Sequence, residues 1–245
     1  MTMSSVSSVA HVEAVAEQRG MAGVYAWMML GLGLTGAVAW FAASTPAVLA
    51  FIQGRIWVLF ALVAVQFVVA LILGTMVMRL PPALATVLFL VYSALTGLTL
   101  SLLVVLFPIG AIMLAIAATA VVFGLLSAYG FLTRRDLSGL ALFFFFALLG
   151  LALVSTVNYF FLSSGWLDWL LSIGSVLVFA GMTAYQTQQI KRRLAEARDA
   201  HGAGQATLYG AFTLYLNFIN MFLRFLALTG KQQNTAQRAG TSVHK

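Results

Sequence analysis

Leu214-Tyr-Leu-Asn-Phe-Ile-Asn-Met-Phe222 is the stretch of sequence that best indicates the fold. It lies within a hydrophobic segment, residues 206–229, that is long enough to cross a bilayer core, which needs about 20 apolar residues in a helix. Four polar or charged side chains interrupt the segment at steps of four, three and four residues: Thr213, Asn217, Asn220 and Arg224. An α-helix stacks these steps along one stripe, and lipid would leave such groups unpaired. We therefore expect the stripe to face protein or trapped water, and this helix to lie at the centre of a bundle, wrapped by the other spans.

The composition is that of an integral membrane protein. Of 245 residues, 62% are hydrophobic and 8% are charged, whereas soluble domains carry roughly a quarter charged residues. Six stretches hold no charged side chain: residues 20–54, 56–78, 80–133, 137–167, 169–190 and 200–223. Because the third breaks at Pro108 into two spans, the sequence predicts an all-α fold with seven transmembrane helices. They occupy residues 21–44, 56–78, 83–106, 110–132, 138–161, 169–190 and 206–229 of a membrane domain that covers residues 21–230.

Prolines and charges agree with this segmentation. All four prolines lie between the predicted spans, where they remove no helical hydrogen bond: Pro46, Pro81, Pro82 and Pro108. The basic residues that give the net charge of +7 lie at span ends, a pattern typical of membrane topology rather than of nucleic-acid binding. The absence of cysteine excludes disulfides and thiolate sites.

The basic residues also predict an orientation in the membrane. Eight lie on one side of the predicted spans: Arg19, Arg79, Arg134, Arg135, Lys191, Arg192, Arg193 and Arg198. Four lie on the other side: Arg55, Lys231, Arg238 and Lys245. The side with eight should be cytoplasmic, which puts residues 1–20 inside the cell as a mostly mobile tail and residues 231–245 outside as a second tail. The basic residues in the second tail argue against its outside position. A cleaved signal peptide is the alternative interpretation of residues 21–44.

Local patterns predict how the spans pack and connect. Small residues recur every four positions at Ser93, Gly97 and Ser101, which predicts a face on which a neighbouring helix packs closely. A short loop is expected around Pro46 to Arg55. Residues 191–205 are expected to form a soluble loop that starts as a helix and loosens at residues 201–204.

Titratable groups are scarce inside the spans. The six acidic residues lie outside them: Glu13, Glu17, Asp136, Asp168, Glu196 and Asp199. The three histidines lie in tails or a loop, without metal-ligand spacing: His11, His201 and His244. An intramembrane aspartyl hydrolase would need a carboxylate pair, and a serine nucleophile would need a base. We therefore expect neither an enzyme, nor a metal site, nor a bound cofactor.

The polar residues within the spans admit two interpretations. In one, buried amides such as Asn158 and Asn220 join helices by hydrogen bonds, Arg224 snorkels to the interface and Arg79 marks a span end. In the other, Gln186 and Asn217 face each other across a polar interior, and Arg79 reaches in from the cytoplasmic end of the second span. Gln186 lies five residues before Lys191, or about 7 Å by helical rise, so a contact with Arg79 is geometrically allowed. These residues alone leave both interpretations open.

Five segments carry a resemblance to one family of membrane proteins. They are Met78-Arg79, Tyr92-Ser-Ala-Leu-Thr-Gly-Leu-Thr-Leu-Ser101, Tyr129 with Arg135-Asp-Leu-Ser138, Thr183-Ala-Tyr-Gln-Thr-Gln188 and Leu214-Tyr-Leu-Asn-Phe-Ile-Asn-Met-Phe222. Together they resemble the Bax inhibitor-1, or transmembrane Bax-inhibitor-motif, family, and its bacterial members in particular. The resemblance covers the whole membrane region and implies a seven-helix fold with a central last helix, in the bacterial inner membrane.

The resemblance also implies a pH-sensitive calcium leak. In the family, an aspartate after the tyrosine of the sixth-helix motif and another after Tyr-Leu of the seventh-helix motif form a proton-sensing pair, onto which the arginine after the second span latches. Arg79 matches that arginine, but Gln186 and Asn217 stand at the two aspartate positions. Two close carboxylates share a proton and attract a divalent cation, whereas two amides do neither. We therefore expect an altered or lost calcium leak and pH switch.

Two functions follow from these expectations. The first is an ion leak or channel with calcium as the implied cargo, Arg79, Gln186 and Asn217 as pore and latch residues, and a secondary polar lining. That lining comprises Thr213, Asn220 and Arg224. The alternative is a non-conducting membrane regulator whose basic run, residues 191–198, docks a partner such as a membrane protease or a stress-response protein. Both functions place the chain in a lipid bilayer and neither involves nucleic acid.

Overall fold

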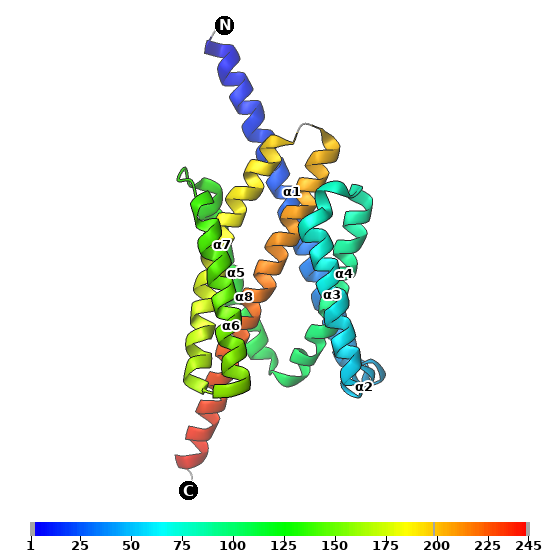
Figure 1. Ribbon diagram of the computed structural model, residues 1–245, viewed down its shortest axis with the longest axis vertical. Helices are drawn as coiled ribbons and strands as arrows, with labels where there is room; N and C mark the ends of the chain where they lie inside the picture. Colours follow the sequence, from blue (N-terminus) through cyan, green and yellow to red (C-terminus); the bar gives the residue numbers. More distant parts are fainter. Residues whose placement is uncertain (1–2, 198, 244–245) are drawn as a thin grey trace. The chain divides into compact units, whose positions relative to one another are not determined.

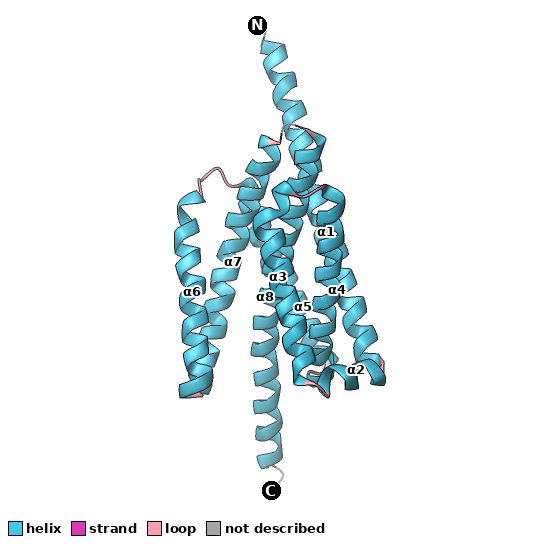
Figure 2. Ribbon diagram, turned by 45° about the vertical axis from the view of Figure 1, so that its right-hand side comes forward, coloured by secondary structure: helices cyan, strands magenta, loops and turns pink. Residues whose placement is uncertain are grey.

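The computed structural model describes residues 3–197 and 199–243, and the side chains of residues 19–197 and 199–229. In chain order its elements are α1 (Met3–Ser44), α2 (Pro46–Gln53), α3 (Ile56–Met76), η1 (Val77–Arg79), α4 (Pro82–Leu106), α5 (Ile109–Leu132), η2 (Ser138–Leu140), α6 (Ala141–Val157), η3 (Asn158–Leu162), α7 (Gly165–Glu196) and α8 (Ala200–Val243). Here η1 and η2 are 3-10 turns and η3 is a π turn. Figure 1 follows these helices along the chain, and Figure 2 shows no strand among the described residues. The prediction of an all-α fold is confirmed.

Seven segments of the described chain are long and apolar enough to cross a membrane. They are Arg19–Ser44, Ile56–Arg79, Pro82–Leu106, Ile109–Leu132, Ser138–Leu162, Gly165–Glu196 and Ala200–Thr229. A helix suits such a segment because it satisfies every backbone N–H and C=O group internally, where lipid offers no partner. Each predicted span lies within one of these segments, which confirms an integral membrane protein with seven transmembrane helices.

Prolines begin helices in this chain rather than interrupt them. Pro46 and Pro82 are the first residues of α2 and α4, and Pro108 is the N-cap of α5. The prediction of a loop between the first two spans is wrong for residues 46–53, which form α2. A short helix starts there because Pro46 already has the helical φ angle and has no N–H group to leave unpaired at the first position.

The loop before the last span is shorter than the sequence predicts. α7 continues to Glu196, in agreement with the predicted helical start, but residues 201–204 belong to α8 and do not loosen. Asp199 explains the difference because it caps the new helix: its Oδ1 accepts the N–H of Gly202 at 2.7 Å, and its carbonyl accepts the N–H of Ala203 at 3.0 Å. Residue 198, part of the predicted docking run, lies outside the described residues.

The two predicted tails continue the first and last helices. Residues 3–20 belong to α1, where the sequence predicts a mostly mobile tail, and residues 231–243 belong to α8. The first stretch contains no proline, and no glycine before Gly20, so no residue there ends a helix. The side of the membrane on which each tail lies stays a prediction.

The chain forms two compact units. Unit 1 comprises residues 1–106 and 188–215, and unit 2 comprises residues 107–187 and 216–245. α7 and α8 therefore each contribute one part to unit 1 and another to unit 2. Half of the most apolar stretch of α8 is buried, a larger share than in any other span. That α8 is wrapped by the other six spans stays a prediction.

In unit 1, α1 packs closely on the small-residue face of α4. Ser93, Gly97 and Ser101 are all buried. A Cβ atom on Gly97 would lie 2.6 Å from the carbonyl oxygen of Thr35 on α1, so the helix backbones meet where the side chain is absent. The predicted close-packing face is confirmed.

Within unit 1, a hydrogen bond and aromatic contacts join the first part of α8 to α1 and α4. The hydroxyl of Tyr215 lies 2.7 Å from Oγ1 of Thr35, and its ring meets those of Phe89 and Tyr92 edge to face at 5.6 and 6.0 Å. Tyr215 and Phe89 are fully buried. Such edge-to-face contacts add to the burial of the rings themselves, so Tyr215 anchors α8 against α1 and α4.

In unit 2, α6 and α7 run side by side, as both Figure 1 and Figure 2 show. The ring of Phe144 lies 5.8 Å from that of Tyr185 and faces Gly181, whose added Cβ would meet it at 3.1 Å. The turn between the two helices is closed by Asn158, which is 2% exposed. Its side chain donates to Ser164 O at 3.3 Å and Asp168 Oδ1 at 3.1 Å, and accepts the N–H of Ser164 at 3.0 Å.

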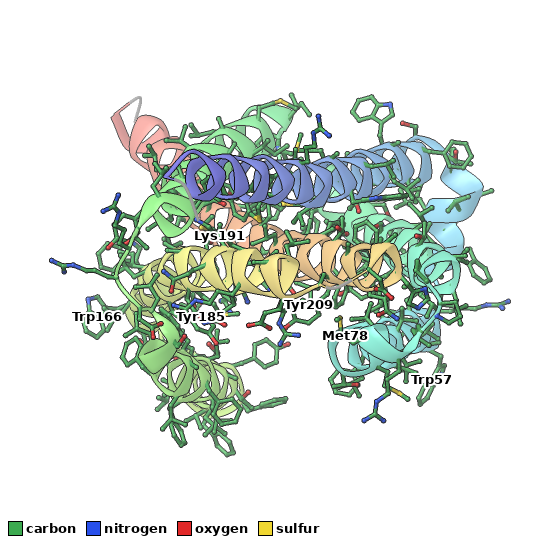
Figure 3. The ribbon with its side chains drawn as sticks, turned by 90° about the horizontal axis from the view of Figure 1, so that it is seen from above. Trp57, Met78, Trp166, Tyr185, Lys191 and Tyr209 are labelled. Atoms are coloured by element: carbon green, nitrogen blue, oxygen red, sulfur yellow. The ribbon has the colours of Figure 1, made fainter. Side chains whose placement is uncertain are left out.

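Tryptophans at helix starts point away from the protein. Trp166, at the start of α7, is 70% exposed, and Trp57, at the start of α3, is 79% exposed. Both rings project from their helices in Figure 3. An exposed indole at the end of a membrane span is typical of the aromatic belt at the bilayer surface.

Candidate functional site

The candidate site is built around Asn217 in unit 2. Its side chain is 1% exposed and donates two hydrogen bonds to α7, to Phe179 O at 3.0 Å and to Thr183 Oγ1 at 2.6 Å. Thr183 in turn donates to Phe179 O at 2.8 Å. Both N–H groups of the amide are thereby used, which fixes its orientation and directs Oδ1 away from these partners. Asn217 Oδ1 is buried and has no hydrogen-bond partner among the described residues.

Gln186 supplies a second buried amide oxygen in the same unit. It follows Thr183 by three residues on α7, a spacing that puts the two side chains on the same side of the helix. Gln186 is half-buried, and its Oε1 is buried without a hydrogen-bond partner. In the described part of the chain only three buried side-chain oxygens lack a partner, and the third is Ser155 Oγ. Each such oxygen costs about 1–3 kcal/mol if nothing donates to it, so each of the two amides favours a hydrogen-bond donor at its oxygen.

α5 brings a further polar contact to α7. Ser127 and Thr187 are both buried, and their hydroxyl oxygens lie 3.0 Å apart. One turn further along α5, Gly130 lies directly against the backbone of Ala184, whose Cα would be 2.7 Å from an added Cβ. The missing side chain at Gly130 therefore allows the helices to approach closely enough for the hydroxyl contact.

The other predicted residues differ in their surroundings. Arg79 is exposed in η1 of unit 1, and its predicted reach to Gln186 and Asn217 stays a prediction. Thr213 and Arg224 are half-buried, whereas Asn220 is exposed. The predicted stripe therefore does not face protein along its whole length, because the buried side of α8 near Asn217 is centred on Met221 and Phe222, and Asn220 lies beyond its edge.

Sequence reasoning did not assign a role to Thr183, Ser127 or Gln205. Thr183 opens the sixth-span motif, and its position three residues before Gln186 was the available signal. Ser127 lies in an otherwise apolar helix, and no pattern in the sequence links it to Thr187. Gln205 is buried and donates to Leu80 O at 2.7 Å, which ties α8 to the turn after Arg79.

Carboxylates lie at the ends of the helices in this part of the structure. Asp168 falls in the first turn of α7, because that helix starts at Gly165, and its Oδ1 accepts a hydrogen bond from Asn158. Asp136 accepts the backbone N–H of Ser138 in the connection before α6 at 2.9 Å. Among the described residues, no group of three or more His, Cys, Asp or Glu side chains is arranged to hold a metal ion.

Comparison with known proteins identifies the family. A family model described as "Inhibitor of apoptosis-promoting Bax1" matches residues 17–234, which include all seven spans. The chain belongs to this family. The resemblance to Bax inhibitor-1 proteins is therefore confirmed, and the motifs with Gln186 and Asn217 lie inside the matched region.

Individual relatives support the same assignment. The inner membrane protein YbhL of Escherichia coli (strain K12) is 41% identical over 218 residues, which cover 88% of this chain and 93% of that protein. An uncharacterized protein of Deinococcus radiodurans is 40% identical over 207 residues, 84% of this chain and 87% of its own length. One of Borreliella burgdorferi is 32% identical over 223 residues, 91% of this chain and 96% of its own length. The similarity thus spans whole chains rather than one motif.

Proposed function

We propose that this protein is an ion-leak or channel-type membrane protein whose passage is lined by neutral amides rather than by carboxylates. The observation that carries the proposal is the pair of buried amide oxygens, Gln186 Oε1 and Asn217 Oδ1, that lack a hydrogen-bond partner among the described residues. Polar groups within transmembrane helices face the bundle interior or a water-filled cavity, and unpaired oxygens there support a path for water or ions. Calcium is the cargo that the family resemblance implies.

The neutral pair sets the chemistry of the proposed passage. Amide oxygens are accepted ligands of calcium, but a site without carboxylates holds the ion far more weakly. Weak binding favours passage over retention, because an ion that is held too tightly does not leave. Gln186 and Asn217 do not titrate, so the flux would not be switched by a proton shared between these two positions.

The remaining predicted residues keep supporting roles in this proposal. Arg79 acts as the latch that closes the passage, and a secondary polar lining extends it. That lining comprises Thr213, Asn220 and Arg224. We further propose the bacterial inner membrane as the location, with the N-terminus in the cytoplasm, since YbhL is an inner membrane protein by name and the basic residues favour this orientation.

Flux through reconstituted protein tests the proposal. The full chain is incorporated into vesicles that hold a calcium-sensitive dye, and calcium entry is followed at several pH values. We expect calcium to enter faster than in protein-free vesicles. The entry rate should lack the pH dependence that a proton shared between carboxylates at positions 186 and 217 would cause. Entry no faster than in protein-free vesicles at every pH, for calcium and for sodium or potassium, would contradict a leak function.

A second function, a non-conducting membrane regulator without enzymatic activity, is favoured by the geometry of Asn217. Both N–H groups of this amide hold α7, so the α7–α8 contact would stay closed as it would with a permanently protonated acid. The basic end of α7 offers a docking surface for a membrane protease or another partner, and Arg193 there is exposed and stacks on Tyr209 at 4.4 Å. Photocrosslinking from Arg193 in native membranes that captures no protein would contradict this second function.

A further inference from the structure

The first turns of α8 clamp the connection that follows Arg79. Gln205, only 6% exposed, donates from Nε2 to Leu80 O at 2.7 Å. One residue earlier, Gly204 lies beside Pro82, whose Cβ would be 3.7 Å from a Cβ added to the glycine. All of these residues belong to unit 1. The connection between η1 and α4 is therefore held on α8 by one hydrogen bond from a buried glutamine and one packing contact.

His201 completes this clamp as a neutral ring. Its Nε2 lies 3.2 Å from Nε2 of Gln205, one helical turn further along α8. An amide nitrogen only donates, so Nε2 of His201 accepts and its ring proton sits on Nδ1. The two N–H bonds of Gln205 are thus divided between Leu80 and His201.

Protonation of His201 removes one of these two bonds. Histidine side chains in general change charge between pH 5 and 8, and the charged ring has a donor at both nitrogens. If Gln205 turns its amide over to accept from the charged ring, Oε1 faces Leu80 O and that hydrogen bond is lost. If the exposed ring of His201 instead swings into solvent, Gln205 loses one of its two partners. Either outcome weakens the clamp.

Charged residues flank the clamp on the elements that form it. Arg79 is the last residue of η1, directly before the clamped connection, and Glu196 is exposed at the end of α7. Asp199 accepts the backbone N–H of Gly202 in the cap of α8. A positive charge on His201 in the first turn of α8 is opposed by the helix dipole.

We propose that His201 is a proton-sensitive contact that holds the Arg79 connection on α8 when neutral and releases it when protonated. The consequence for flux rests on the proposed function, since Arg79 is the latch there, but the release itself does not. Proton sensing would then lie at the end of a span, in an imidazole, rather than at the two amide positions within the membrane.

An engineered disulfide measures the docking of the connection directly, because the chain has no cysteine. Pro82→Cys with Gly204→Cys puts the two Cβ atoms about 3.7 Å apart, within the range of disulfides. The full-length double variant is equilibrated with glutathione buffer from pH 8 to pH 5, and the effective concentration of the two thiols is determined. The matched control adds His201→Gln, which accepts from Gln205 through its amide oxygen and does not titrate. The ratio between the two proteins cancels the pH dependence of the thiols.

The ratio decides the inference. We expect it to be near unity at pH 8 and to fall at acidic pH by roughly fivefold, the factor that corresponds to one ordinary hydrogen bond. A ratio that is the same at both pH values would overturn the proposal. If the cysteine pair prevents folding, hydrogen exchange of residues 77–86 in the unmodified chain and in His201→Gln, compared at equal pH, gives the same decision: faster exchange at acidic pH only with His201 supports it, and equal exchange refutes it.

Neither readout involves ion flux, so the two proposals fail separately. Release of the connection in a protein with no flux would refute the leak function and leave the histidine contact intact. Flux without any His201-dependent release would refute the histidine contact alone.

Discussion

Gly130→Ala is the substitution for which the structure predicts the largest effect from the smallest change. A Cβ at this position of α5 would meet the backbone of Ala184, 2.7 Å from its Cα and 2.8 Å from its carbonyl carbon. Real Cβ atoms do not approach backbone so closely, and a backbone atom cannot turn away as a flexible side chain can. α5 and α7 must therefore separate, which also stretches the Ser127–Thr187 contact of 3.0 Å.

The same helix offers a matched control. Gly124, also in α5, has nothing within 4 Å of an added Cβ, so Gly124→Ala gains helix propensity of about 0.5–1 kcal/mol without a clash. Overpacking of the kind expected at Gly130 costs about 1–3 kcal/mol, and the weakened hydroxyl contact adds about 1 kcal/mol. After subtraction of the propensity gain, Gly130→Ala should destabilise by about 2 kcal/mol, and the two variants should differ by about 3 kcal/mol.

Thermal unfolding in detergent micelles measures this difference. For a chain of this size about 3 kcal/mol corresponds to a gap of roughly 6–12 °C between the two transition midpoints, with Gly130→Ala below the parent protein and Gly124→Ala at or above it. Equal midpoints for the two alanine variants would refute the close approach of α5 to α7. They would also refute the buried contact between Ser127 and Thr187 that this approach allows.

Three further substitutions test other contacts by the same thermal assay. Asn217→Ala should lower the free energy of unfolding by about 2 kcal/mol, because it removes two hydrogen bonds to α7 and leaves a small void. Asn220→Ala, at an exposed position, should lower it by less than about 0.5 kcal/mol. Equal losses would contradict the burial of Asn217 against α7. Gln66→Leu should change stability by less than about 1 kcal/mol, because the two threonine hydroxyls that Gln66 contacts on α4 also bond to carbonyls of their own helix. A larger loss would contradict this and show that the hydrogen bonds of Gln66 hold α3 on α4. Ser163→Gly should raise stability by about 0.5–1 kcal/mol, because Ser163 has a left-handed φ of 47° that glycine adopts without strain; a lower midpoint would indicate that the serine side chain stabilises the turn.

The spans could be predicted from the sequence because a bilayer imposes one simple requirement on them. A run of about 20 residues without charge is sufficient evidence for a crossing helix, and the four prolines between the first four spans agree with their boundaries. Helix starts in the connections were harder to predict. α2 and the start of α8 depend on Pro46 and Asp199, single residues whose effect is decided by local hydrogen bonds rather than by a periodic pattern.

The candidate site was predictable in part. Gln186 and Asn217 follow from the two motifs, and the structure buries an unpaired oxygen at each. The partner of Asn217 was not predictable, because Thr183 is selected by the register of α8 against α7, and neither helix shows that register in its own sequence. The exposure of Asn220 has the same origin. A stripe of polar residues identifies one face of a helix, but it does not show which part of that face a neighbouring helix covers.

Calcium flux with and without carboxylates at the two amide positions tests the central claim most directly. The parent protein, the double variant Gln186→Asp with Asn217→Asp, and the control Asn220→Asp are reconstituted at equal density and followed between pH 5 and pH 8. We predict that calcium flux through the double variant depends steeply on pH, whereas flux through Asn220→Asp depends on pH as it does in the parent protein. Flux that responds to pH identically in all three proteins would contradict the claim that Gln186 and Asn217 form the neutral centre of the passage.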